Sequence, residues 1–304
     1  FRDVGNAYLR RIRQLRVAGK ADILWIEKEA LPWLPWMIER ALLQRGAPIV
    51  ADYDDALFHQ YDQNPSVIIR HLLGRKIDDV MAASAVVTAG NEYLAERARQ
   101  AGARRVEILP TVIDIHRYPI VPRNHQAAHP KIGWIGTPST WVEYMLNLMP
   151  LLLTLASDYA ARVVAVGAGQ NLDPHPLFDS LPWTEQTEVE QIQDMDIGIM
   201  PLTDTPWSRG KCGYKLIQYM ACGLPVVASP VGVNTEIVEH GVNGFLASNE
   251  AEWRLALETL LSDGELRRRM GAAGRQKVEE KYSVQVHGPR VAALLSEIAR
   301  AGRA

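Results

Sequence analysis

The chain has 304 residues, of which 47% are hydrophobic and 22% are charged, and its formal net charge at pH 7 is −2. This composition is typical of a globular protein that is long enough for about two domains with full hydrophobic cores. Because the chain has no overall basic excess, we do not expect nucleic acid as a partner.

The cysteines point to a reducing compartment. Cys212 and Cys222 lie at the two ends of one short expected helix, where a disulfide between them is geometrically disfavoured. Neither has a metal-like spacing to histidine, so we expect no metal site. No secretory signal is visible, and the longest apolar run, 145–156, is too short to span a bilayer. These features favour a cytoplasmic protein.

The first third of the chain alternates helices and strands. Residues 1–20 are expected to form a basic amphipathic helix, whose arginines either face water, which we favour, or dock on anionic lipid. The apolar runs that follow predict strands at 23–26, 48–51, 85–89 and 106–109, with helices at 32–46 and 66–82. Strands that alternate with helices in this way predict a parallel sheet.

Polar side chains follow the second of these strands. Parallel sheets bind ligands beyond the carboxyl ends of their strands, so Asp52 and His59 are candidates for a general base at that edge. Glu27, Asp54 and Asp55 lie in equivalent positions. The alternatives are that the acids cap the next helix and that His59 is an ordinary surface residue. The short pattern Asp52-Tyr53-Asp54 is too weak to indicate a metal–nucleotide site.

A second parallel sheet is expected in the rest of the chain. Residues 123–130 read as a linker, and strands are predicted at 131–135, 162–166, 196–201 and 225–229. Helices are predicted at 137–157, 214–221, 250–261, 263–282 and 283–299, and a further helix capped by Asn234 or Thr235. The run Arg267-Arg268-Arg269 is expected to be solvated.

The loop 208–213 and the helix after it suggest an anion site. The helix start offers unpaired N–H groups and a positive dipole end, and glycines at 210 and 213 let a ligand approach the backbone. Lys211 and Lys215 would share one face if the first turn extends back. The alternative is a surface helix with two solvated lysines.

The stretch around this helix carries a long, ordered pattern. Residues 220–229 read MACGLPVVAS, and they are followed in order by Gly232, Glu236, Ile237, Val238, Gly241, Asn243, Gly244 and Leu246. This pattern resembles the C-terminal half of family-4 glycosyltransferases, which have the GT-B fold. The resemblance implies an α/β protein with two Rossmann-like parallel-sheet domains facing a cleft.

The resemblance also implies a domain plan. Residues 1–122 would form the acceptor-side domain, which we expect to be incomplete at its N-terminus, because no strand with a glycine-rich turn precedes Val4. After the linker 123–130, residues 131–282 would bind the nucleotide-sugar donor. Residues 283–304 would form a helix that crosses back to the first domain.

The candidate site departs from the family pattern. The two motif glutamates, which in the family contact the donor sugar and the ribose, fall on Gly210 and Gln218. The Arg and Lys that often clamp the diphosphate are absent near Gly136 and Thr137, which would offer backbone and hydroxyl contacts. We therefore expect Lys211 and Lys215 to supply the positive charge. Two further positions complete the expected donor site: Gly213 at the helix start and Trp183 beside the base, with plain core an equal alternative for Trp183.

By resemblance, the chain is expected to be a retaining glycosyltransferase of the hexosyltransferase type, acting in glycan or glycolipid synthesis. It would use a nucleotide-sugar as co-substrate, no metal or other cofactor, and a saccharide or lipid-linked acceptor. Peripheral contact with the inner face of the membrane is left open. The alternatives are a nucleotide-sugar epimerase on the same fold, a non-catalytic nucleotide-sugar-binding protein and, less favoured, an NAD-dependent oxidoreductase, whose fingerprint after Gly167 is broken at Leu172.

Overall fold

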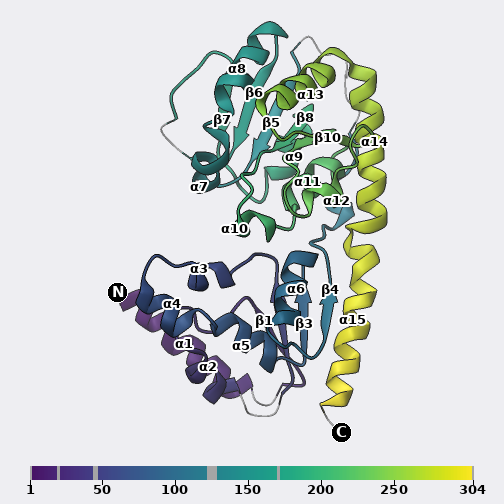
Figure 1. Ribbon diagram of the computed structural model, residues 1–304. Coiled ribbons are helices and arrows are strands. Elements are labelled where there is room, and N and C mark those ends of the chain that lie inside the picture. Colours follow the sequence, from purple (N-terminus) through teal and green to yellow (C-terminus); the bar gives the residue numbers. More distant parts are fainter. Residues whose placement is uncertain (1, 19–20, 44–46, 122–128, 170–171, 303–304) are drawn as a thin grey trace. The chain divides into compact units, whose positions relative to one another are not determined.

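The computed structural model describes residues 2–18, 21–43, 47–121, 129–169 and 172–302 (Figure 1). These residues form two compact units, each built on one parallel sheet. The first unit comprises Phe1–Thr111, Thr205–Cys212 and Gly288–Ala304, and the second comprises Val112–Asp204 and Gly213–His287. The expected fold class, α/β with two Rossmann-like parallel sheets, is confirmed. The predicted linker, 123–130, lies almost entirely outside the described residues.

The sheet of the first unit has four parallel strands in sequence order. They are β1 (Leu24–Glu27), β2 (Ile49–Tyr53), β3 (Val86–Ala89) and β4 (Val106–Ile108). The register pairs Glu27 with Asp52 and Asp52 with Thr88. Three polar side chains from three adjacent strands therefore stand in one row at the carboxyl edge.

Helices cover this sheet on both faces. The helices of the first unit are α1 (Arg2–Ala18), α2 (Trp36–Leu43), α3 (Phe58–Asp62), α4 (Val67–Leu73), α5 (Lys76–Ala83), α6 (Glu92–Gln100), the short α10 (Pro206–Arg209) and the larger part of α15 (Val284–Ala301). From α15, Leu294 and Ile298 pack on Val50 and Val86 of the sheet. The single helix expected at 66–82 is wrong: the chain breaks at Gly74 between α4 and α5.

The sheet of the second unit has six parallel strands in the order β10-β9-β8-β5-β6-β7. They are β5 (Lys131–Ile135), β6 (Arg162–Val166), β7 (Phe178–Leu181), β8 (Ile197–Met200), β9 (Val226–Ala228) and β10 (Gly244–Leu246). The chain builds outward from β5 to β7 and then returns to place β8 on the other side of β5. The sheet therefore has a switch point between β5 and β8.

The helices of the second unit are α7 (Pro138–Thr140), the π-helical turn η2 (Trp141–Met145), α8 (Met149–Asp158), α9 (Glu188–Gln193), α11 (Tyr214–Ala221), α12 (Asn234–Ile237), α13 (Glu250–Ser262) and α14 (Gly264–Lys281), together with the 3₁₀ turn η1 (Ile115–Arg117). The continuous helix expected at 137–157 is interrupted by η2. The expected cap at Asn234 or Thr235 is also wrong: Val233 is the N-cap of α12, and the Asn234 amide donates to the carbonyl of Ser229.

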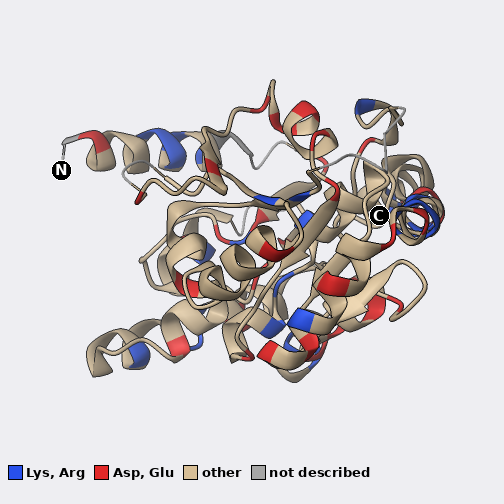
Figure 2. Cartoon of the chain, turned by 90° about the horizontal axis from the view of Figure 1, so that it is seen from above, with Lys and Arg blue, Asp and Glu red and all other residues tan. Residues whose placement is uncertain are grey.

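Charge is distributed over both units, and the basic residues of α1 lie along the helix next to the N label in Figure 2. Arg10, Arg11, Arg13 and Arg16 are all exposed. Within the described ranges, every helix is too short or too polar to cross a bilayer.

Candidate functional site

The switch point of the second sheet defines the first candidate site. Open parallel sheets bind ligands in the crevice beyond the carboxyl ends of the two strands that flank such a point. Here Gly136 and Thr137 follow β5, and residues 201–204 follow β8. Two residues predicted for donor binding therefore lie at the position that the topology favours.

Gly136 and Thr137 form a tight turn into α7. The Gly136 amide donates to the carbonyl of Val166 at 3.0 Å, and the Thr137 hydroxyl accepts from the amide of Thr140 as the helix cap. A Cβ on Gly136 would lie 2.3 Å from the indole of Trp134, so only glycine fits there without movement. Thr137 is exposed, and its hydroxyl also lies 3.0 Å from the hydroxyl of Ser139.

Lys215 reaches this turn from α11. Its ammonium lies 4.7 Å from the ring centroid of Trp134, and a Cβ on Gly136 would lie 2.9 Å from the same nitrogen. The helix is fixed because the Tyr219 hydroxyl accepts from the amide of Ile135 at 2.9 Å. The structure thus brings Lys215 and Gly136 together, as the sequence-based site requires.

The start of α11 is set by Gly213. This N-cap residue has φ of +69°, a left-handed conformation that favours glycine. A Cβ there would lie 2.2 Å from Cδ1 of Ile237. Because the helix begins at Tyr214, it does not extend back to Lys211. The condition under which Lys211 and Lys215 would share one helical face is therefore not met.

Gln218 lies one turn further along α11 and is buried. Its amide donates to the hydroxyl of Tyr118 at 3.1 Å. Burial raises the pKa of Tyr118 well above its usual range. The amide group of Gln218 is therefore engaged inside the second unit, and Tyr118 is a partner that sequence reasoning did not find.

Trp183 lies at the rim of a cavity in the second unit. It is 51% exposed, and its indole N–H donates to Glu188 at 3.0 Å. The cavity has a volume of about 930 Å³ and is also lined by Gly167 and Leu181. Gly167 has φ of +77°, and a Cβ there would lie 2.3 Å from the carbonyl oxygen of Gly136. Of the two sequence-based alternatives, the exposed position agrees with a pocket wall.

The segment Thr205–Cys212 belongs to the first unit, so Gly210 and Lys211 are grouped with that unit and the other donor candidates with the second. Gly210 packs closely on the first unit, since a Cβ there would lie 2.4 Å from Cβ of Ala56. The Asn91 amide donates to the carbonyls of Gly210 and Lys211, each at 3.1 Å. Asn91 also caps α6 through the amide of Leu94.

Lys211 has an acidic neighbourhood in the first unit. Burial raises the pKa of Asp55, and the positive charge of Lys211 acts against that rise. Asp55 also lies 3.8 Å from the ammonium of Lys28, which pairs with Asp54 at 3.0 Å. The lysine at position 28, which the sequence did not single out, thus joins this charged cluster.

Asp52 lies in the row of polar side chains at the carboxyl edge of the first sheet. Burial and the nearby charges of Asp54 and Glu27 raise its pKa, while the hydrogen bond from the Thr88 hydroxyl, at 2.5 Å, lowers it. A carboxylate with a raised pKa holds a proton more tightly than an ordinary aspartate, which suits a general base.

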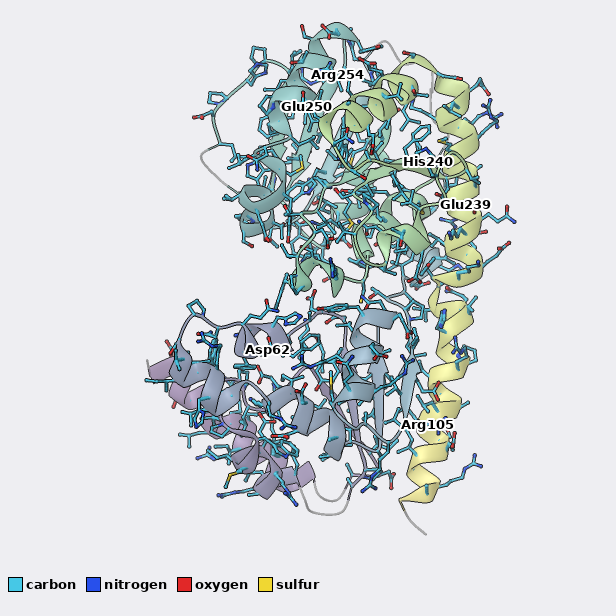
Figure 3. All side chains as sticks on the ribbon, viewed as in Figure 1. Asp62, Arg105, Glu239, His240, Glu250 and Arg254 are labelled. Carbon is cyan, nitrogen blue, oxygen red and sulfur yellow. The ribbon has the colours of Figure 1, made fainter. Side chains whose placement is uncertain are left out.

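His59 has both ring nitrogens engaged. Its Nδ1 lies 2.9 Å from Asp62, and its Nε2 lies 2.8 Å from the hydroxyl of Tyr93. Asp62, labelled in Figure 3, also pairs with Arg97 at 3.1 Å. The imidazole is therefore part of a hydrogen-bonded network. The alternative of an ordinary surface histidine is wrong, since its side chain is only 8% exposed.

The candidate residues thus fall into two groups. Gly136, Thr137, Trp183, Gly213, Lys215 and Gln218 belong to the second unit, and Asp52, His59, Gly210 and Lys211 belong to the first. Across the described ranges, the structure shows no cluster of three or more acidic, histidine or cysteine side chains that could hold a metal ion.

Comparison with known proteins finds a family similar to the middle part of the chain. Residues 129–263 match the protein family described as "Glycosyl transferases group 1". This segment, which contains the switch-point site, is therefore similar to glycosyltransferases of group 1.

Two curated relatives extend this similarity. The chain is 26% identical over 247 residues to the GDP-mannose-dependent monoacylated alpha-(1-6)-phosphatidylinositol monomannoside mannosyltransferase of Corynebacterium glutamicum, covering 69% of this chain and 61% of the relative. It is 36% identical over 72 residues to N-acetyl-alpha-D-glucosaminyl L-malate synthase of Bacillus anthracis, covering 23% and 19%. The chain thus spans less than two thirds of the length of either relative.

Solved structures share the fold. The structure of the Anabaena protein HepE in complex with UDP and glucose matches with a TM-score of 0.73 at 18% identity, over 94% of this chain and 81% of that chain. Sucrose-phosphate synthase from Thermosynechococcus elongatus matches with a TM-score of 0.72 at 14% identity, over 94% and 76%. These likenesses confirm the expected fold class, α/β with two parallel-sheet domains.

Proposed function

We propose that the chain is a glycosyltransferase of the hexosyltransferase type. It transfers a sugar from a nucleoside-diphosphate-sugar to a hydroxyl of a saccharide or lipid-linked acceptor in glycan or glycolipid synthesis. As in family 4, we propose that the anomeric configuration is retained and that no metal is required. The observation that carries the proposal is the ammonium of Lys215 beside Gly136 at the switch point of a segment similar to glycosyltransferases of group 1.

The donor is assigned to the second unit. Lys215 and the backbone of the Gly136–Thr137 turn would bind the diphosphate, and Trp183 would form a wall of the base pocket. As the bond between the anomeric carbon and the phosphate oxygen breaks, its electron pair passes to the diphosphate, and a fixed positive charge stabilises that growing negative charge. Lys211 is proposed as a second cation for the same leaving group.

The acceptor is assigned to the first unit. Its hydroxyl oxygen forms the new bond to the anomeric carbon, and Asp52 takes the hydroxyl proton. The raised pKa of Asp52 favours this role. His59, whose ring is held by Asp62 and Tyr93, stays a second candidate for contact with the acceptor.

The base of the donor nucleotide is to be identified by experiment. The Corynebacterium relative is named as GDP-mannose-dependent, whereas the Anabaena structure contains UDP. We therefore propose a nucleoside diphosphate and leave the base to experiment. A nucleotide-sugar epimerase would convert the donor without an acceptor, and product analysis in the absence of acceptor separates it from a transferase. A non-catalytic binding protein would bind the donor without turnover.

The direct test replaces the two lysines. We expect the double variant Lys211→Ala/Lys215→Ala to remain folded and to lose most of its turnover, because a charge-assisted contact contributes about 1.5–3 kcal/mol, or roughly ten- to a hundredfold. Lys281→Ala, on the exposed last turn of α14, is the matched control for loss of one surface charge. Full activity in the double variant would contradict the assignment.

Peripheral membrane contact is a separate part of the proposal. Exposed arginines along α1, with the exposed apolar side chains of Val4 and Leu9, favour attraction to anionic lipid. Sedimentation with vesicles that contain an anionic phospholipid tests it. Binding that is lost when Arg10, Arg11 and Arg13 become glutamine supports the contact, and absence of binding by the native chain rejects it.

A further inference from the structure

The loop 28–35, which follows β1, has an unusual backbone. Among the described residues, three that are not glycine have a positive φ: Lys28 at 64°, Trp33 at 61° and Ala160 at 50°. Two of the three lie in this one loop. Left-handed backbone is unfavourable for bulky side chains, and it persists where surrounding groups fix it, commonly at functional sites.

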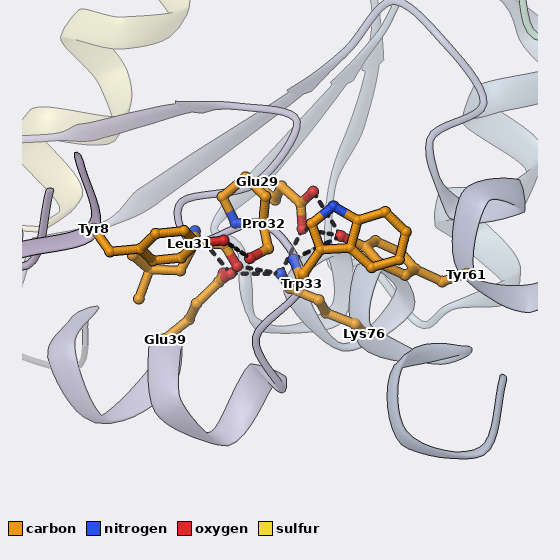
Figure 4. Close-up of polar contacts among 8 residues, drawn as sticks. All are labelled: Tyr8, Glu29, Leu31, Pro32, Trp33, Glu39, Tyr61 and Lys76. Atoms are coloured by element: carbon orange, nitrogen blue, oxygen red, sulfur yellow. Dashed lines mark hydrogen bonds and ion pairs between the residues drawn. The ribbon is translucent and has the colours of Figure 1, made fainter. Parts of the chain in front are cut away.

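A buried ion cluster holds the loop 28–35 in place. The ammonium of Lys76 is fully buried and pairs with Glu29 and, at 2.8 Å, with Glu39 (Figure 4). It also donates to the carbonyl of Leu31 at 2.6 Å, and the Leu31 amide donates to Glu39 at 2.9 Å. Two points of the loop, positions 29 and 31, are thereby tied to α5 and α2.

The far end of the loop is tied to α3. The Tyr61 hydroxyl donates to the Glu29 carboxylate, with distances of 2.8 and 2.9 Å to its two oxygens, and accepts from the Trp33 amide at 3.0 Å. The rings of Trp33 and Tyr61 meet edge to face, with centroids 5.2 Å apart. Both the backbone and the ring of Trp33 are therefore held in one orientation.

This arrangement is a poor way to gain stability. Burying two carboxylates around one ammonium incurs a desolvation penalty, and apolar side chains of similar volume often stabilise a core as well or better. Burial raises the pKa of Glu39, which shows the same penalty. What the cluster secures is one conformation of the loop, and that conformation leaves Trp33 45% exposed.

We propose that Trp33 is a preformed stacking surface for a pyranose ring of the acceptor, and that Glu29, Glu39 and Lys76 are positioning residues for it. This inference rests on the proposed function, since it deepens the acceptor side of the first unit. One face of a pyranose presents C–H groups that pack on an aromatic ring, while hydroxyls at its edge hydrogen-bond to carboxylates. The loop leaves the carboxyl end of β1, the edge at which parallel sheets bind ligands.

The charges at this edge favour a sugar over a lipid surface. Four carboxylates lie at the carboxyl ends of β1 and β2, on Glu27, Asp52, Asp54 and Asp55. Lys28 is held by two of them. These four carboxylates would repel anionic lipid, whereas sugar hydroxyls donate hydrogen bonds to carboxylates. Arg10 and Arg11 of α1 line a pocket with Leu31 and Pro32 of the loop 28–35, so the vesicle measurement below tests the lipid alternative directly.

The first test observes Trp33 directly. The full chain is labelled with 5-fluorotryptophan, and the Trp33 resonance in the ¹⁹F NMR spectrum is assigned by its loss in Trp33→Phe. Titration with methyl glycosides of glucose, mannose, galactose and N-acetylglucosamine is expected to shift this resonance with at least one sugar. Met37→Ala, which removes an apolar side chain that is 80% exposed on α2, is the matched control and should leave the shift unchanged.

The second test separates acceptor from donor kinetics. We expect Trp33→Ala to raise the acceptor KM about tenfold, in line with typical aromatic contacts, with the donor KM unchanged. Lys76→Met should raise the acceptor KM in the same way. Lys76→Met leaves the carboxylates of Glu29 and Glu39 buried without a cation and could prevent folding. The triple variant Glu29→Gln/Glu39→Gln/Lys76→Met removes all three charges and replaces it in that case.

The outcomes distinguish the two proposals. If a nucleoside diphosphate binds but no glycoside shifts the Trp33 resonance and Trp33→Ala keeps its acceptor KM, the stacking surface is refuted while the proposed function stands. If glycosides shift the resonance and no nucleotide binds, the proposed transferase fails and the sugar site remains. Binding of Trp33 to phospholipid vesicles, lost in both Trp33→Ala and Met37→Ala, would replace the sugar by a membrane.

Discussion

The ammonium of Lys215 lies over the indole of Trp134, 4.7 Å from the ring centroid, at the carboxyl end of β5. A cation held over an aromatic face is stabilised in place by about 0.5–2 kcal/mol. Glycine is needed at position 136, because a Cβ there would lie too close to both the Trp134 ring and the Lys215 ammonium. The donor-side charge of the second unit thus depends on a lysine, a tryptophan and a glycine together.

Replacing Gly136 by alanine should therefore disturb both stability and donor binding. The new Cβ would lie 2.3 Å from the Trp134 ring, and overpacking of this kind costs about 1–3 kcal/mol. We expect a lower calorimetric melting temperature and weaker binding of a nucleoside diphosphate. Gly5→Ala is the control, since its Cβ meets nothing within 4 Å. Unchanged stability and affinity in Gly136→Ala would show that the turn does not hold Lys215.

Asn91 is expected to contribute more to the free energy of unfolding than an ordinary helix cap does. Asn91→Ala removes the cap of α6 and the hydrogen bonds to the carbonyls of Gly210 and Lys211. We expect a loss of about 2 kcal/mol, against about 1 kcal/mol for Asn249→Ala, which removes the cap of α13 and one exposed hydrogen bond to Glu252. Chemical denaturation measures both. Equal losses would mean that Asn91 does not tie the segment 205–212 to the first unit.

Cys212 reports on the packing of that segment without any mutation. Burial raises the pKa of its thiol to about 12, and a Cβ on Gly90 would lie 2.3 Å from its sulfur. Because the thiolate is the reactive form, we expect Cys212 to resist alkylation in the native protein and to react on unfolding. Peptide mass spectrometry after a timed reaction with iodoacetamide measures this. Rapid native labelling would contradict the packing of 205–212 on the first unit.

Asp52 should make stability depend on pH. Burial, with the charges of Asp54 and Glu27, raises its folded-state pKa above the unfolded value. Its contribution is thus fully present below about pH 4 and is lost as the pH rises through the folded pKa. Asp52→Asn should therefore raise the melting temperature near neutral pH relative to wild type and give no such gain below about pH 4. It should also lower turnover. If Asp52→Asn raised the melting temperature equally near neutral pH and below about pH 4, the pKa of Asp52 would not be raised in the folded state.

Periodicity was sufficient to predict most of the sheets. The strands at 86–89, 131–135, 162–166, 197–200 and 226–228 are apolar runs buried on both faces, and such runs carry a strong signal. The edge strand β7 has the sequence Phe-Asp-Ser-Leu and was not predicted, because its position depends on pairing with β6. Local sequence does not record such pairing.

Tertiary contacts explain the errors in the helices and charges. Arg267 was expected to be solvated with its neighbours, yet it is 3% exposed and donates to the carbonyls of Leu260 and Leu261 at the end of α13. The sequence of a run of arginines does not indicate whether one of the side chains is buried. Likewise, nothing near Lys76 in sequence indicates Glu29 and Glu39, which come from 47 and 37 positions earlier.

The candidate site was predictable in part. The glycines at 136 and 213 and the lysine at 215 could be found because they lie at a strand end and a helix start, where backbone geometry needs particular residues. The partners Trp134, Tyr118 and Asn91 could not be found, since their roles arise from contacts across the fold. Lys211 was correctly placed in the loop before the helix, which begins at Tyr214 as expected, so the first turn does not extend back to it.

The measurement that tests the central claim most directly is nucleotide binding by the chain. Isothermal titration with UDP, GDP, ADP and CDP should show binding of at least one of them, with affinity reduced about tenfold or more in Lys215→Met and unchanged in Lys281→Met. Binding of none of the four, or equal binding by native protein and Lys215→Met, would contradict a donor site at the switch point of the second unit.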